Sequence, residues 1–181
     1  MAGQMLRMIL RVGRRGAVAS EFAIVGIAML SVLFLAIEVI FAMVARGTVE
    51  AGLDRASRVA ATGAPLPNPT MAQRWAQFDL TYSAIVGAVV DYPASITNTI
   101  TSYMKVEWVM TEPTAGELAA LGKTRDQVIR SDLGDTKWYV VYESVYQHPL
   151  LSGMLICGYL LPGCDGRLRM DFRIMRQNEP F

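Results

Sequence analysis

The sequence predicts an α+β fold in which one long N-terminal transmembrane helix leads into a small domain with a few antiparallel strands. Three observations support this prediction. Residues 22–45 form an apolar run of 24 positions whose only charged member is Glu38. The segment 63–69, with three prolines and a glycine, ends the helical pattern. Two later segments, 137–146 and 167–175, have the β-branched, aromatic or alternating character of strands.

The charge of the chain is unevenly distributed and predicts its orientation. Four of the 17 basic residues lie in residues 1–16 with no acid, so the remaining 13 face 16 acids and carry a net charge of −3. A basic head before an apolar run stays in the cytoplasm, which places the rest of the chain in the periplasm. A basic nucleic-acid-binding arm is the alternative, but a total charge of +1 favours no nucleic-acid partner.

The apolar run is long enough for a retained membrane span over about residues 22–45. At about 1.5 Å per residue it extends about 36 Å, against a hydrocarbon core of about 30 Å. A cleaved secretory signal is the alternative, but such signals have shorter apolar cores and an A-x-A-like cut site. The following ARGTVEAG has no such site. The helix is predicted to continue to residue 62, because an apolar stripe recurs at helical spacing through Val49, Leu53, Ala56 and Ala60.

Residues 63–181 are predicted to form one periplasmic α+β domain. Thr70 and Gln73 have the spacing of a capping box, so a second helix begins there and ends before Pro93. Strands are predicted over 105–111, 137–146 and 167–175, with 116–134 weakly helical or a loop. In the last strand, apolar and mostly charged residues alternate, which is typical of a sheet with one buried face.

Cys157 and Cys164 are the only cysteines, and the Pro-Gly turn between them favours an intramolecular disulfide in an oxidising periplasm. Zinc binding together with His148 is the alternative, but two cysteines and the only histidine make a poor zinc pattern. No metal or cofactor is therefore expected. A single histidine excludes H-E-x-x-H, and neither a nucleophile motif nor a phosphate-binding glycine loop is present. The chain is not expected to be an enzyme.

The stretch before the apolar run resembles the type IV prepilin cleavage motif. Gly16 is followed by four small or apolar residues, Ala17 to Ser20, then by Glu21 and the aromatic Phe22. More narrowly, RRGAVASEFAIV, the continuation RASRVAATG and the terminal RQNEPF resemble the TadE family of pseudopilin-like proteins. This resemblance implies a structural minor pilin or assembly component of a Tad-type pilus in the bacterial inner membrane. Its partners would be membrane lipid, a prepilin peptidase and other pilin subunits.

The resemblance also implies roles for the motif residues. The peptidase would remove residues 1–16 by cutting between Gly16 and Ala17. Glu21 would then pair with the new amine of a neighbouring subunit, which explains an otherwise costly acid beside hydrocarbon. The alternative is that Glu21 lies solvated in the headgroup zone. Glu38 is expected to lie at the outer interface, where it can reach water; the alternative is a specific contact with a partner helix.

Two other classes of protein share this topology. One is a periplasmic enzyme or binding module that uses the helix only as an anchor. The other is an anchored adaptor for another envelope machine. Gly16 and Glu21 argue against a simple anchor, because an anchor needs neither residue.

Overall fold

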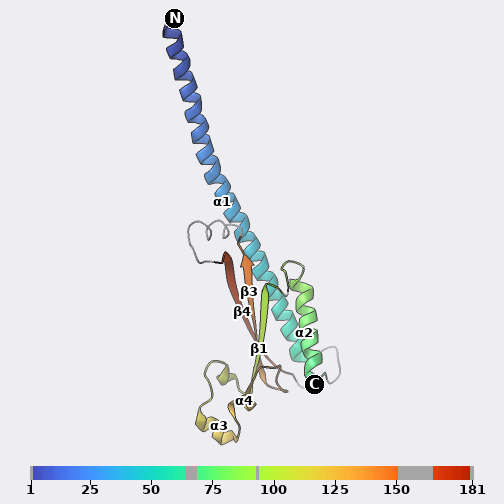
Figure 1. Ribbon diagram of the computed structural model, residues 1–181. Coiled ribbons are helices and arrows are strands. Elements are labelled where there is room, and N and C mark those ends of the chain that lie inside the picture. The colour runs from blue at the N-terminus through green and yellow to red at the C-terminus, as the bar shows by residue number, and fades with distance from the viewer. Residues whose placement is uncertain (1, 64–68, 93, 151–164, 180–181) are drawn as a thin grey trace.

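One long helix and a small domain make up the chain (Figure 1). The computed structural model describes residues 2–63, 69–92, 94–150 and 165–179, and side chains from residue 18 onward. Helix α1 (Ala2–Thr62) is continuous, and its N-terminal half projects beyond the domain. It ends at Gly63, whose φ of 67° is a left-handed conformation that glycine adopts without strain. The predicted α+β class is confirmed.

Helix α2 (Met71–Val86) begins where the capping box predicts. The Thr70 hydroxyl accepts a hydrogen bond from the Gln73 amide, and the Gln73 side chain accepts one from the Thr70 amide at 2.8 Å. Helical spacing in the sequence predicts one apolar stripe through Trp75, Phe78, Tyr82, Ile85 and Val89, but this is only partly correct, because Trp75 and Val89 are 41% and 51% exposed. The face that packs against the rest of the domain repeats every four residues, at Arg74, Phe78, Tyr82 and Val86.

Four antiparallel strands form one sheet in the order β2-β1-β3-β4. Their bounds are β1 (Ile96–Tyr103), β2 (Ile129–Arg130), β3 (Tyr139–Pro149) and β4 (Arg167–Gln177). Strand β3 pairs along its whole length with β4, from Tyr139↔Gln177 to Pro149↔Arg167. The strands predicted over 137–146 and 167–175 are therefore confirmed.

The two faces of the sheet differ as the alternation in β4 predicts. Phe172 is buried in the core, and Met170 and Ile174 pack against it from the same face. On the opposite face Arg173 pairs with Glu143 at 3.1 Å, and Arg169 pairs with Asp171 at 3.0 Å. Helices α1 and α2 cover the apolar face, and the ion pairs lie on the other.

The strand predicted over 105–111 is wrong. This segment contains a 3₁₀ turn, η1 (Val106–Val109), and the strand that pairs with both β2 and β3 is β1, which the sequence pattern missed. In η1 only Trp108 is buried, whereas Val106 and Met110 are 41% and 85% exposed, so no alternating face packs on a core. Strand β1 contains three threonines, whose β-branching suits a strand, but Asn98 and Ser102 share the more buried face with Ile96 and Ile100 and interrupt the apolar alternation. The segment predicted as weakly helical or loop holds α3 (Ala115–Leu121), α4 (Arg125–Val128) and β2.

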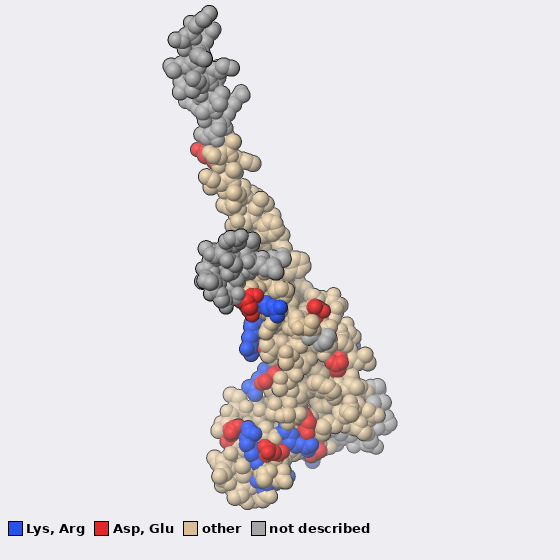
Figure 2. All heavy atoms as spheres, in the orientation of Figure 1, with Lys and Arg blue, Asp and Glu red and all other residues tan. Residues whose placement is uncertain are grey.

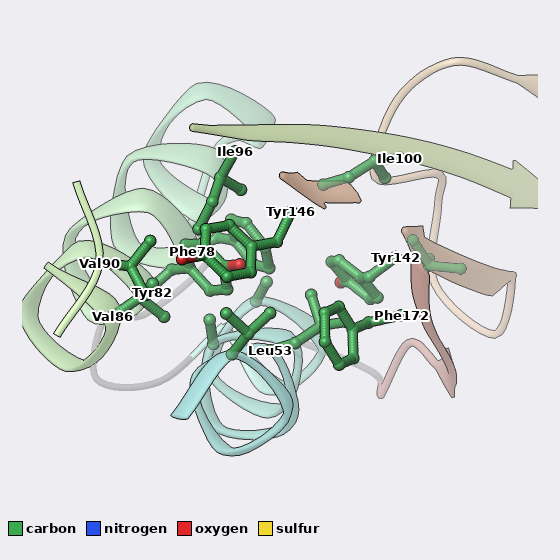
Figure 3. Packing of buried hydrophobic residues seen from close by; sticks show 14 of the residues in the cluster. Leu53, Phe78, Tyr82, Val86, Val90, Ile96, Ile100, Tyr142, Tyr146 and Phe172 are labelled. Atoms are coloured by element: carbon green, nitrogen blue, oxygen red, sulfur yellow. The ribbon is translucent and has the colours of Figure 1, made fainter. Parts of the chain in front are cut away.

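The core lies between the helices and the sheet (Figure 3). Val49, Leu53, Ala56 and Ala60 of the predicted stripe are all fully buried there. Aromatic rings of α2 and β3 fill its centre, with Phe78 stacked on Tyr142 at a centroid distance of 5.3 Å. The hydroxyls of Tyr82 and Ser144 lie 2.6 Å apart in a buried hydrogen bond, so this core joins α1, α2 and the sheet.

Candidate functional site

The motif residues lie on the free half of α1. The Gly16–Ala17 bond is within the helix, at positions whose side chains are not described. Positions 17 and 21 are one helical turn apart, about 6 Å along the axis. Glu21 is exposed, and Phe22 is 79% exposed. Both groups are available to a molecule outside the domain.

Residues 18–37 form an apolar shaft with Glu21 as its only charge. Its large apolar side chains are exposed on every side of the helix. A helix that is apolar all round is normally buried in protein or in lipid. The helix over Val18–Thr62 is long and apolar enough to cross a membrane. Figure 2 shows the shaft almost wholly uncharged on the visible face, with the charged side chains gathered on the domain.

Glu38 marks the point where the shaft joins the domain. It is only 6% exposed, although it belongs to the same apolar run. It lines a cavity of about 210 Å³ with Tyr146, His148 and Pro149, from the end of β3. The domain itself thus covers this acid, and Glu38 does not lie open to water as an ordinary interfacial residue would.

His148, which lines the same cavity as Glu38, is hydrogen-bonded within β3. The Tyr146 hydroxyl and His148 Nδ1 lie 2.8 Å apart in a hydrogen bond in which either group can donate. Burial lowers the pKa of His148, and the nearby Glu38 carboxylate acts in the opposite direction. The geometry favours a structural contact between β3 and α1, and the described residues lining this cavity include no serine, threonine or cysteine.

The other predicted site residues and the other cavities give less evidence of a function. Cys157 and Cys164 lie outside the described residues, so their disulfide stays a prediction. A surface cavity of about 650 Å³ beside η1 and α4 contains Arg125 paired with Glu112 and Arg130 paired with Asp132, each at 2.6 Å. Across the described ranges, no three His, Cys, Asp or Glu side chains are grouped to hold a metal ion.

A buried Arg74–Asn178 network is the feature that the sequence pattern missed. Arg74 Nε donates to the carbonyl of Ala60 at 2.8 Å, and its Nη2 donates to Asn178 Oδ1 at 2.8 Å. Asn178 Nδ2 donates to the carbonyls of Leu133 and Asp135 at 2.6 and 2.9 Å. A polar residue in the repeating buried face of α2 was the available signal. Its partner at position 178 cannot be read from spacing alone.

The same network gives the C-terminal RQNEPF a structural role in its described part, 176–179. Arg176 pairs with Asp54 of α1, which also pairs with Arg58 at 3.3 Å. The Glu179 amide donates to the Ala61 carbonyl at 3.1 Å. Residues 176–179 are thereby joined to the C-terminal part of α1.

Comparison with known proteins adds no relative: the chain matches no family model, no curated protein and no solved structure.

Proposed function

We propose that this chain is a TadE-like minor pilin or assembly component of a Tad-type pilus, held in the inner membrane by α1 with its domain in the periplasm. One observation carries the proposal: the prepilin-like motif Gly16–Phe22 stands at the head of an exposed apolar shaft. The shaft is about 30 Å long, which matches the hydrocarbon core of a bilayer. The basic residues 1–16 would remain in the cytoplasm.

Processing would remove the leader and prepare the helix for assembly. A prepilin peptidase would cut between Gly16 and Ala17, where glycine has no side chain to obstruct the protease. The new amine would lie one turn before Glu21 in its own chain. In a bundle of such helices, Glu21 of one subunit would meet the amine of another only at one axial stagger, so the ion pair would select that stagger. Phe22 would add apolar contact at the same level.

The N-terminus of the mature chain tests this proposal. Intact mass and N-terminal sequencing of protein extracted from piliated cells should give a chain that begins at Ala17. Gly16→Phe should leave the leader attached and abolish piliation, because the bulky side chain obstructs the scissile bond. Gly3→Phe, within the leader and away from that bond, is the matched control and should be processed normally. A native chain that begins at Met1 in piliated cells would contradict the proposal.

The alternative of an anchored enzyme or binding module makes a different prediction. A simple anchor requires only apolar length, so Gly16→Phe would leave its activity and its membrane retention unchanged.

A further inference from the structure

The membrane-side end of the sheet lies beside the first part of α1 that contacts the domain. We call this end, residues 148, 149, 167 and 168, the sheet tip. His148 and Pro149 share a cavity with Glu38 and Ala45. On an adjacent side of the helix, a groove of about 460 Å³ is lined by Leu168 together with Val39 and Met43. The sheet tip is therefore level with residues 38–45 of α1.

The length of the apolar shaft gives the depth of this level. A hydrocarbon core of about 30 Å takes about 20 residues of helix. If it begins at residue 18 it ends at residue 37, and if it begins after Glu21 it ends at residue 41. The headgroup layer adds about 5–7 Å on each side, or about four residues more. The headgroup layer then covers residues 38–41 in the first case and 42–45 in the second, so residues 38–45 lie in the outer headgroup layer or within about four residues of it in both cases.

The surface at this level has the chemistry of a membrane interface. Val39, Met43 and Leu168 are 51%, 68% and 41% exposed, and they continue the apolar surface of the shaft. Arg167, in the sheet tip itself, donates from Nη1 to Gln147 Oε1 at 3.0 Å, and the next charges are Arg46 and Arg169. Arg46 and Arg169 each have an acidic partner at 3.0 Å, Glu50 and Asp171 respectively, so these two pairs carry no net charge. Figure 2 shows charged side chains beginning where the domain meets the shaft.

We propose that the sheet tip rests in the outer headgroup layer of the bilayer that α1 crosses, with Val39, Met43 and Leu168 in contact with lipid. This inference rests on the membrane span in the proposed function. Lipid is the occupant that the surface favours, because the exposed apolar residues are continuous with the shaft and the charges of Arg46 and Arg169 beyond them are paired. The inference also explains the burial of Glu38, which lies beside a cavity lined by the end of β3 at a depth where lipid would otherwise surround it.

Tryptophan quenching by lipid tests the inference on the full chain. Each variant is placed in nanodiscs of phosphatidylcholine brominated near the headgroup end of the acyl chains, one chain per disc. Leu168→Trp probes the sheet tip, Phe34→Trp the shaft, and Met110→Trp the far end of the domain, where Met110 is 85% exposed. The signal of the parent chain, which contains Trp75, Trp108 and Trp138, is subtracted. Met43→Trp, on the exposed surface of α1, is the second probe if Leu168→Trp does not fold.

We expect the added fluorescence to be quenched in Phe34→Trp and in Leu168→Trp, and unchanged in Met110→Trp. Quenching of Phe34→Trp with neither Leu168→Trp nor Met43→Trp quenched would overturn the inference, because the domain would stand clear of the bilayer while α1 still crossed it. Absence of quenching in Phe34→Trp would overturn the membrane span, and the inference with it.

Discussion

The two halves of helix α1 have the same backbone conformation but opposite surroundings. In residues 18–37 the apolar side chains point in all directions and are exposed. In residues 45–61 they are confined to one stripe, which the domain buries completely at Val49 and Leu53. The other side of that half carries ion pairs, such as Arg46–Glu50 at 3.0 Å. The distribution of apolar residues around the helix thus separates a half whose partner lies in the same chain from a half whose partner must come from outside.

The largest expected effect is on the free half, and it concerns assembly. Glu21→Gln keeps the size of the side chain and removes its charge, so the proposed ion pair is lost while helix packing is kept. We expect a processed, membrane-inserted protein of normal abundance that supports no pilus assembly, measured by immunoblot and a piliation assay. Normal pili would show that Glu21 is only a solvated acid. An uncleaved variant would assign Glu21 to recognition by the peptidase.

A pair of leucine substitutions compares the two halves directly. Leu53→Ala removes a fully buried side chain from the core, whereas Leu33, in the shaft, is 54% exposed. We expect Leu53→Ala to lower the free energy of unfolding of the domain by about 2–5 kcal/mol, and Leu33→Ala to change it by less than about 0.5 kcal/mol. Denaturant unfolding of the full chain in detergent, followed by tryptophan fluorescence, measures both. Equal effects would mean that the shaft also packs on the domain.

A glycine pair tests how closely α1 packs on α2. A Cβ at Gly52 would lie 2.6 Å from Val86 Cγ2, and Val86 is fully buried and stiff, whereas a Cβ at Gly47 would meet nothing within 4 Å. Gly52→Ala should therefore cost about 1–2 kcal/mol, since overpacking outweighs the gain in helix propensity. Gly47→Ala should gain about 0.5–1 kcal/mol from propensity alone. The same unfolding measurement decides, and a stabilised Gly52→Ala would contradict the close approach.

The smallest expected effect is a pH dependence at the junction. Because burial lowers the pKa of His148 from its ordinary 6.5, the unfolded chain binds the proton more tightly than the folded chain. The contribution of His148 to stability is complete above about pH 6.5 and is lost as the pH falls through the lower folded value. Unfolding measured between pH 7.5 and 5 should show this loss, and His148→Gln should reduce it. Glu38→Gln should enlarge it, because the carboxylate raises the pKa of His148. An unchanged profile in His148→Gln would contradict the assignment.

Local patterns predicted the elements whose neighbours are close in sequence. The Thr70–Gln73 capping box and Gly63 lie at the ends of helices, where backbone groups need local partners or a left-handed residue. The alternation in β4 predicted its buried face, because side chains on a strand point to opposite sides in turn. The same reasoning failed for 105–111, where β-branched and aromatic residues occur without a second strand to pair with.

The candidate site also combines features that the sequence determines with features that depend on the fold. The sequence alone determined the apolar run, its basic head and the motif from Gly16 to Phe22, because composition and spacing are properties of the chain itself. Only the tertiary structure decided that Glu38 is buried beside a cavity that Tyr146 and His148 also line. It also joined Arg74 to Asn178, a pair 104 residues apart. Burial and hydrogen-bond partners of this kind depend on which distant segments pack together, and no local pattern records that.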